Sequence, residues 1–514
     1  MSNDNNDIIS IANEIATQKE NIRLAIVAQG VTCNPSTPLN EYPGKIANIN
    51  GMTTVPNAIW SDNTITSATT TYTVPAGVGI VGGRIFDDNR ANLETLDLNG
   101  AIAITENTCY DCTNLTNLTG INIKYIGENC FDNCYNLTSL ESDSLEYIGD
   151  KAFQHCYNVT SGLEEIDCPS VKYVGVEGFN NNQLLHEVSL PSCKEIGGGA
   201  FKYAGNQIWT TENINITYDL SSVEKIGYEG IYNNVSLTSI NLPKVKDLGI
   251  RCFRDNTRLA SVSAPVCDNI KDQCFYACPA LTTITAPNVK FIGNDAFSGS
   301  TSNVLANING SNQCNLPECE YVGSSAFYGN IKFNSLSLAD GCYIGNYAFR
   351  YGSYSNNSLS YAYIRPTVVG AFAFAGRIMP YNIDFSLCTY IGSNAFNPRV
   401  DNNDGTYNVF YDQGLDFSSM ETFDVSQYES TSSSYKYNRI FYKVGTSSSS
   451  KVKVWMPKTA VVTGDKGWIF SECYLNIYTD AANSSELGTY SRINWGGGDV
   501  SYQWGTTHED FLNA

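Results

Sequence analysis

Apolar and polar residues alternate along this chain in a unit that recurs about every 22 residues. One half of the unit has an aliphatic residue, Gly, two polar residues, a small residue and Phe, as in IGENCF from Ile126. The other half spaces three aliphatic residues as Leu237, Ile240 and Leu242 are spaced. The alternation at its end predicts a short β-strand with one buried face. A fixed period of this length predicts a solenoid of stacked repeats.

The register of the repeat is set by the aliphatic residue that opens each unit. These residues are Val81, Ile104, Ile126, Ile148, Val174, Ile196, Ile226, Leu248, Ile270, Ile292, Val322, Ile344, Val369 and Ile391. Their spacing is mostly 22 residues and otherwise longer, as expected when insertions lie in loops between repeats. We therefore predict an α/β repeat fold over residues 72–405, a solenoid of about 14 repeats of about 22 residues with one short strand each.

Stacking of the repeats would place equivalent side chains over one another. The recurring aromatic residues are Phe131, Phe153, Phe179, Phe201, Phe253, Phe275, Phe297, Phe327, Phe349, Phe374 and Phe396. Burial of one such ring contributes roughly 1.5–3 kcal/mol, so we expect a single aromatic column in the core. The Gly after the aliphatic residue allows either a tight turn or a close approach of neighbouring backbones.

The cycle IGxxAFxxC…LxxIxLP resembles the treponemal type of leucine-rich repeat, which is found in BspA-like proteins. The resemblance covers about residues 72–405. It implies a right-handed curved solenoid with one strand per repeat, used mainly for adhesion and for contact with proteins or glycans.

The N-terminal residues predict helices before the repeats begin. Ile8, Ile15 and Ile22 are seven residues apart within residues 7–29 and form an apolar stripe. This stripe suits either a partner helix or packing within the chain. The segment up to about residue 50 resembles a short module of tail and other virion proteins of phages that infect gut bacteria, which implies an anchoring role.

The remaining boundaries follow from composition. Residues 1–50 are assigned to the helical anchoring or oligomerisation segment, and residues 51–71 to a connector rich in Thr, Asn and Ser. After the solenoid, the period fades, and residues 406–514 are predicted to form a β-rich C-terminal cap. Four tryptophans in this last region either cover the open end of the solenoid or bind a partner, and we favour covering.

Charge excludes several classes of partner. The 514 residues carry a net charge of −20, which disfavours nucleic acid and anionic membrane surfaces. No apolar stretch is long enough to span a bilayer, so membrane insertion is not expected. The first residues lack the basic and apolar regions of a secretory signal.

No residue pattern points to catalysis, a cofactor or a metal. Most of the 17 cysteines recur at fixed positions of the repeat, so we predict that they are small buried apolar residues. The alternative is a metal site built from Cys109 and Cys112 or from Cys130 and Cys134, but a second matching pair is missing. The three histidines adjoin no nucleophile motif, and the carboxylates are scattered. We therefore expect no enzyme, no cofactor and no metal.

Three hypotheses for function remain. The first is a phage virion protein (a tail fibre, head fibre or receptor-binding appendage) that assembles in the host cytoplasm, leaves by lysis, and contacts other virion proteins through residues 1–50. We expect a homo-oligomer, with a trimer favoured. The second is a BspA-type adhesin of the bacterial cell surface, and the third is an interaction scaffold. A glycan or protein receptor would contact exposed strand residues or a Tyr-rich insertion, and the candidates are Thr238, Ser239, Asn241, Tyr354, Tyr361 and Tyr363.

Overall fold

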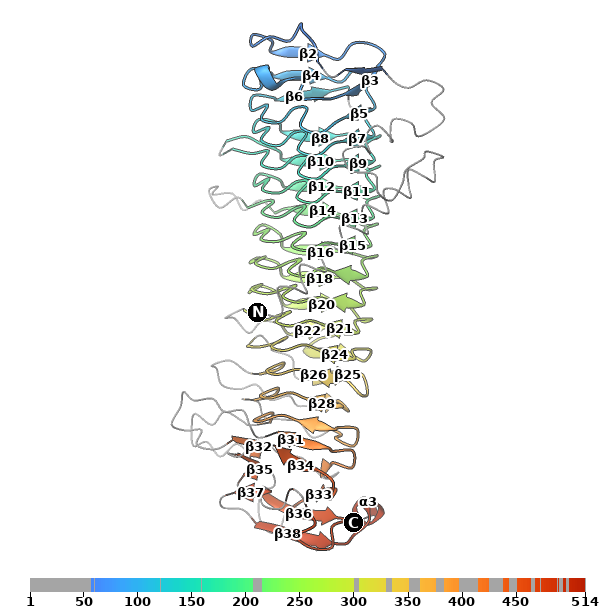
Figure 1. The fold of residues 1–514 in the computed structure, drawn as a ribbon, viewed down its shortest axis with the longest axis vertical. Helices are drawn as coiled ribbons and strands as arrows, with labels where there is room; N and C mark the ends of the chain where they lie inside the picture. Colours follow the sequence, from blue (N-terminus) through green and yellow to red (C-terminus); the bar gives the residue numbers. More distant parts are fainter. Residues whose placement is uncertain are drawn as a thin grey trace. The chain divides into compact units, whose positions relative to one another are not determined.

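Each repeat contributes two short strands, and both kinds of strand pair in parallel with their equivalents in the neighbouring repeats (Figure 1). We call the predicted strand, with its buried middle residue, the primary strand. The secondary strand is mostly two residues long and ends at the aliphatic residue before the Gly. The predicted solenoid is confirmed, and the secondary strand is an addition to it.

The computed structural model divides the chain into two compact units, Met1–Leu237 (unit 1) and Thr238–Ala514 (unit 2). The predicted helices of residues 1–50, with Ile8, Ile15 and Ile22, lie outside the residues that the structure describes. The described residues are 57–59, 61–120, 122–158, 160–206, 215–299, 305–329, 335–350, 361–375, 383–396, 415–424, 438–442, 451–463, 467–471, 473–487, 489, 493–495 and 499–513.

Unit 1 has primary and secondary strands in regular alternation. Its primary strands are β2 (Thr71–Thr73), β4 (Thr95–Asp97), β6 (Asn117–Thr119), β8 (Ser139–Glu141), β10 (Glu165–Asp167), β12 (Glu187–Ser189) and β14 (Thr217–Asp219). Its secondary strands are β1 (Asn57–Ile59), β3 (Val78–Val81), β5 (Ala103–Ile104), β7 (Tyr125–Ile126), β9 (Tyr147–Ile148), β11 (Tyr173–Val174), β13 (Glu195–Ile196) and β15 (Lys225–Ile226). A short 3-10 helix, η2 (Asp87–Asn89), lies between β3 and β4.

Unit 2 begins with a seven-stranded sheet of primary strands. These strands are β16 (Ser239–Asn241), β18 (Ser261–Ser263), β20 (Thr283–Thr285), β22 (Asn307–Ile308), β23 (Gln313–Leu316), β25 (Ser335–Leu338) and β27 (Tyr361–Tyr363). Its secondary strands are β17 (Asp247–Leu248), β19 (Asn269–Ile270), β21 (Phe291–Ile292), β24 (Tyr321–Val322), β26 (Tyr343–Ile344), β28 (Val368–Val369), β29 (Tyr390–Ile391), β31 (Thr422–Asp424) and β34 (Val461–Thr463).

Parallel pairing continues through the region predicted as a cap. A four-stranded sheet contains β30 (Leu415–Asp416), β33 (Val452–Trp455), β36 (Tyr474–Thr479) and β38 (Asp499–Trp504). A three-stranded sheet contains β32 (Asn438–Tyr442), β35 (Gly467–Ser471) and β37 (Asn494–Trp495). The final helix, α3 (His508–Asn513), packs with Phe511 beside Trp455, which is 5% exposed. Trp455 therefore belongs to the core, in agreement with a covering role for this tryptophan.

The aromatic column is confirmed within each unit. In unit 1, Phe131, Phe153, Phe179 and Phe201 stack with ring centroids 5.1–5.3 Å apart. In unit 2, a second column begins at Phe253 and continues beyond the predicted repeats. Its last members are Phe396, Phe441 and Phe470, with successive centroids 5.1 Å apart. Residues after 405 therefore extend the same core, although they lack the IGxxAF motif.

The regular spacing of the Gly residues reflects close approach between repeats. A Cβ atom built on Gly149 would lie 2.7 Å from the carbonyl carbon of Gly127, one repeat earlier. The backbone of neither residue has a positive φ. Of the two roles predicted for this Gly, the structure therefore selects close backbone approach.

The turns of the repeat use left-handed residues at a different position. The third residue after the opening aliphatic residue has a positive φ even where it has a side chain, as at Asn129 (50°), Lys151 (54°) and Glu177 (54°). The backbone N–H of Lys151 donates to the carbonyl of Val176 in the next repeat at 2.8 Å. The equivalent residues of neighbouring repeats make the same kind of hydrogen bond. Stacking of the repeats therefore stabilises a left-handed backbone conformation that residues with a side chain rarely adopt.

Candidate binding surface

The outward residues of the primary strands differ between the two units. In unit 1 they include the carboxylates Asp97, Glu141, Glu165, Asp167, Glu187 and Asp219. In unit 2 the outward side chains described on the seven strands are all uncharged. They belong to Ser239, Asn241, Ser261, Ser263, Thr283, Thr285, Asn307, Gln313, Asn315, Ser335, Ser337 and Tyr363, and we call them the uncharged strand face. In a chain with a net charge of −20, this is a long surface without carboxylates.

The strand register orders this face into rows. Asn241 pairs with Ser263, and Ser263 pairs with Thr285. Farther along the sheet, Ser337 pairs with Tyr363. Neighbouring strands lie about 4.8 Å apart, so each row presents hydroxyl and amide groups at a regular spacing that a repeating ligand can follow.

The sheet is interrupted between β20 and β25, where the sequence carries an insertion of eight residues. Strands β22 and β23 come from the same repeat and pair only through Ile308 and Cys314. The loop between them includes Asn309 and Asn312, both with positive φ. An open hollow of about 570 Å³ lies here, and the residues that line it include Thr283, Thr285, Pro287, Asn307, Asn309 and Ser311.

Most residues predicted to bind a receptor lie on the uncharged strand face. Ser239 and Asn241 are exposed on β16, the first strand of the sheet, and Thr238 is half-buried directly before it. Tyr361 and Tyr363 belong to β27, the last strand, and Tyr363 is 62% exposed. The two patches predicted as rivals are therefore opposite ends of one sheet. Tyr354 lies outside the described residues.

Sequence reasoning missed the hollow because its residues fall in an insertion. The repeat spacing lengthens to 30 residues between Ile292 and Val322, and we assigned the extra residues to a loop. The segment Asn307–Gln313, which is NINGSNQ, contains the polar residues and the Gly that build the interruption. Only the pairing of β22 with β20 shows that the segment returns to the sheet.

A charged cluster marks the border of the face beside Tyr363. The guanidinium of Arg365 contacts Asp340 at 2.9 Å and Asp384 at 2.8 Å. These carboxylates, with the hydrogen bonds that they accept, raise the pKa of Arg365 above its usual range. One cation faces two carboxylates here, so the cluster leaves a negative charge at this border of the sheet.

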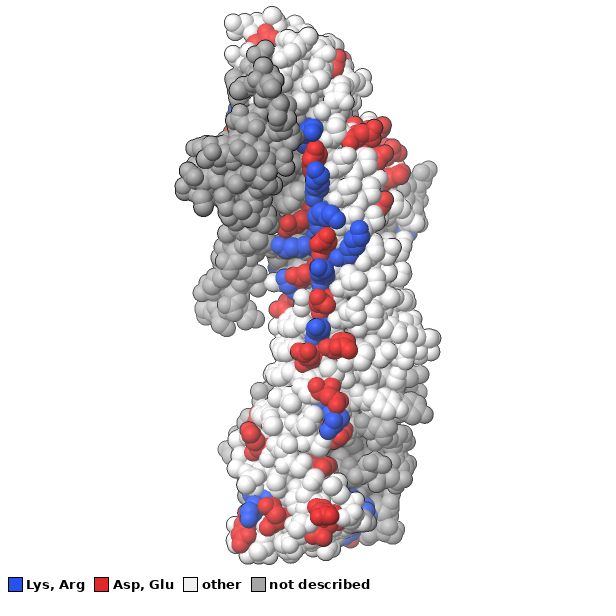
Figure 2. Space-filling view, turned by 90° about the vertical axis from the view of Figure 1, so that its right-hand side faces the viewer, with Lys and Arg blue, Asp and Glu red and all other residues white. Residues whose placement is uncertain are grey.

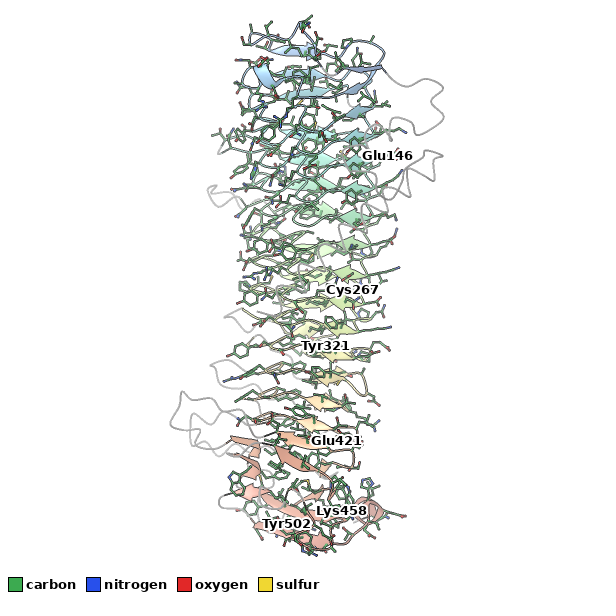
Figure 3. All side chains as sticks on the ribbon, viewed as in Figure 1. Glu146, Cys267, Tyr321, Glu421, Lys458 and Tyr502 are labelled. Atoms are coloured by element: carbon green, nitrogen blue, oxygen red, sulfur yellow. The ribbon has the colours of Figure 1, made fainter. Side chains whose placement is uncertain are left out.

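The secondary strands carry a different surface. In unit 1, Tyr125, Tyr147 and Tyr173 stack with centroids 4.9 and 5.1 Å apart. Beside them, Glu146 contacts both Lys124 and Lys172. Figure 2 shows a stripe along which Lys and Arg alternate with Asp and Glu, and Figure 3 labels Glu146.

The electrostatics of Glu146 follow from these contacts. Burial by itself would raise the pKa of the Glu146 carboxyl, but the hydrogen bond from Lys172 and the charges of Lys172 and Lys124 outweigh it and lower the pKa. Opposite charges are thus matched between successive repeats. The surface is self-complementary, so it offers little unbalanced charge to a partner.

The described cysteines are buried, as predicted. Many also donate through their thiol, as Cys267 does to the carbonyl of Asn269 at 3.2 Å. Burial raises the pKa of Cys267, labelled in Figure 3, to about 12. Among the described residues, no group of three or more His, Cys, Asp or Glu is arranged to hold a metal ion.

Comparison with known proteins places the repeats in a family. Residues 50–400 match the BspA type leucine rich repeat region in overlapping copies, at 50–160, 121–220, 157–263, 207–304 and 268–400. The chain belongs to the BspA-type leucine-rich-repeat family. No curated protein matches it.

Solved structures similar to this BspA-type chain have low sequence identity. A leucine-rich repeat protein from Bacteroides ovatus is 19% identical, with 63% of this chain and 86% of that chain covered and a TM-score of 0.36. A leucine rich cell surface protein from Faecalibacterium prausnitzii is 15% identical, with 87% and 90% covered and a TM-score of 0.29. The T. pallidum leucine rich repeat protein is 19% identical, with 45% and 76% covered and a TM-score of 0.20. The family assignment rests on the matched repeats of this BspA-type chain.

Proposed function

We propose that this chain is a non-enzymatic adhesive protein of a bacterial cell surface, which binds its ligand through the uncharged strand face of unit 2. Proteins of the BspA-type repeat class are typically binding proteins without catalytic activity. The observation that carries the proposal is the absence of charge along all seven primary strands of this sheet. Among the described residues, no helix is long and apolar enough to cross a bilayer.

The polar but uncharged side chains of this face suit a neutral ligand. A surface that carries carboxylates repels acidic partners and attracts cations. Hydroxyl and amide groups can both donate and accept, so they adapt to a ligand with the same groups. Exposed Tyr side chains add contact area at a low cost in conformational entropy. The uncharged strand face combines these properties from Ser239 at one end to Tyr363 at the other.

A binding assay with matched variants tests the proposal. The labelled full chain is applied to cultured epithelial cells and to intact bacteria, and bound protein is measured by flow cytometry. The test variant carries Asn241→Asp, Ser263→Asp and Ser337→Asp, which place three carboxylates on the uncharged strand face. The control variant carries Thr95→Asp, Thr119→Asp and Thr217→Asp on the primary strands of unit 1. We expect the test variant to lose binding and the control variant to keep it.

Two results would contradict the proposal. One is equal binding by both variants, because the face would then not be the contact. The other is a steep fall in binding as salt rises, because a neutral contact is only weakly screened. Circular dichroism and thermal unfolding of both variants show whether each remains folded.

The virion hypothesis depends on residues 1–50, which lie outside the described residues, and we place it second. Its partner role through residues 1–50, the homo-oligomer and the trimer remain predictions. Immunogold electron microscopy of a lysed infected culture separates the two locations. Gold on cell envelopes supports the surface adhesin, whereas gold at discrete positions on phage particles would replace it with a virion component.

A further inference from the structure

The uncharged strand face is hollowed at the interruption between β20 and β25. Its loop is fixed by its own hydrogen bonds. The side-chain amide of Asn309 accepts from the N–H of Ala286 at 2.6 Å and donates to the carbonyl of Asn315 at 2.9 Å. The side-chain oxygen of Asn307 accepts from the N–H of Asn312 at 2.9 Å. The hollow is therefore formed before any ligand arrives.

Several polar side chains at the hollow remain available. The hydroxyls of Thr285 and Ser311 and the amide of Gln313 have no hydrogen-bond partner among the described residues. Gln313 folds over the loop, since its amide nitrogen lies 1.6 Å from the position that a Cβ atom of Gly310 would take. Glycine at position 310 thus leaves room for a polar side chain at the rim.

The residues that line the hollow define the chemistry of a ligand. None of them carries a charge, so neither an anion nor a cation finds a counterion there. Hydroxyls and amides converge beside the ring of Pro287, which is exposed and apolar. A sugar residue has hydroxyls at its edge and C–H groups on its face, and it fits this combination. A peptide side chain would need a deeper apolar pocket or a charged partner.

We infer that this hollow is a subsite for one residue of a neutral oligosaccharide, an inference that rests on the binding role proposed above. The hollow measures about 570 Å³ and is broadly open, so it can take one sugar residue without enclosing it. Thr285, Ser311 and Gln313 bind the hydroxyl groups of the sugar, and Pro287 contacts its C–H face.

The rest of the oligosaccharide crosses the strands toward Tyr363. From β22, the sheet continues through β23 and β25 to β27, three strand spacings or about 14 Å away. The intervening outward residues Asn315 and Ser337 are polar and lie in register with Tyr363. The exposed ring of Tyr363 then supplies a second contact with a sugar face.

Saturation-transfer difference NMR of the full chain tests the assignment. The probes are neutral tetrasaccharides of glucose, galactose, mannose and N-acetylglucosamine, together with one sulfated tetrasaccharide. Thr285→Arg fills the hollow, and Ser311→Arg does so from the loop. Thr119→Arg adds the same charge to β6, a primary strand of unit 1 that lies outside the uncharged strand face. We expect one or more neutral probes to bind, and both hollow variants to weaken that binding at least about tenfold, which corresponds to about 1.4 kcal/mol. Thr119→Arg should stay within about twofold of the parent chain.

Each other outcome overturns the inference. Binding of the sulfated probe alone would show that charge is recognised, and equal affinity of Thr285→Arg and the parent would place the ligand elsewhere. If no neutral probe binds while the carboxylate variant still abolishes attachment to cells, the subsite is wrong and the proposed function stands. If attachment survives on cells stripped of glycans, the ligand is a protein. If the carboxylate variant attaches normally, the proposed function itself fails.

Discussion

The side-chain amide of Asn182 donates to the backbone carbonyl of Phe153, one repeat earlier, at a distance of 2.8 Å. Cys156 occupies the equivalent position of the preceding repeat, and its thiol donates to the carbonyl of Phe131 at 3.0 Å. The eighth residue after the opening aliphatic residue thus satisfies the carbonyl beside the aromatic column. Two chemically different residues serve this purpose because each is small and has a donor in reach.

Replacement of Asn182 tests this equivalence. We expect Asn182→Cys to keep most of the stability, because a thiol makes the same bond elsewhere and the change removes the buried Asn182 Oδ1, which has no partner. Asn182→Ala should lower the free energy of unfolding by about 1–3 kcal/mol, since the Phe153 carbonyl loses a buried donor. Urea unfolding of both variants measures the difference. Equal losses in the two would show that the bond does not matter.

Close backbone approach predicts unequal losses of stability at two adjacent glycines. A Cβ atom at position 197 would lie 2.6 Å from the carbonyl carbon of Gly175, whereas the nearest atom to one at position 198 is 3.3 Å away. Gly197→Ala should destabilise unit 1 by about 1–3 kcal/mol through overpacking. Gly198→Ala should cost less than about 1 kcal/mol. Thermal unfolding ranks the two variants, and a larger loss at position 198 would refute the packing argument.

Buried thiols predict that the protein weakens at alkaline pH. Burial raises the pKa of Cys267, Cys319 and Cys388 from 9.0 to about 12. Above pH 9 the unfolded chain releases thiol protons that the folded chain keeps, so stability falls as pH rises from about 9 to about 12. The loss is about 1.4 kcal/mol per thiol at one unit above the ordinary pKa. Urea midpoints between pH 7.5 and 10 in reducing buffer measure it.

The repeat itself supplies the control for this pH effect. Val245 and Val289 occupy the position that Cys267 occupies in its own repeat, three residues before the opening aliphatic residue. Changing Cys267, Cys319 and Cys388 to Val should therefore preserve packing and flatten the pH dependence. An unchanged slope would mean that other groups cause the alkaline loss.

The Tyr-rich end of the sheet gives a prediction for attachment. Replacing Tyr354, Tyr361 and Tyr363 by Ala should abolish ligand attachment without unfolding the chain, because the 62% exposure of Tyr363 leaves little packing to lose there. Tyr343→Ala is the matched control, since this tyrosine is 38% exposed on the secondary strand β26. Flow cytometry measures attachment, and circular dichroism reports folding. If the triple variant still attaches, these tyrosines are not the ligand-binding site.

Periodicity could be read directly from the residues, and it defined the repeat, the aromatic column and the burial of the cysteines. These features depend on local spacing and on the cost of exposing Phe131 or Cys267 to water, both of which are properties of the sequence. For the recurring Gly, the sequence left open either a tight turn or a close approach of two backbones. The distance from Gly149 to Gly127 in the neighbouring repeat decided for close approach.

What the sequence alone determined is therefore the stack of repeats and the residues in its core. The tertiary structure decided which polar residues share a surface. Ser239 and Tyr363 are far apart along the chain, yet parallel pairing places them on one sheet. The insertion before Val322 looked like an ordinary loop until β22 paired with β20 and opened the hollow. The spacing of the repeat sets which residues are buried, because burial depends on local contacts. The binding surface depends instead on how strands of different repeats pair, and insertions can change that pairing.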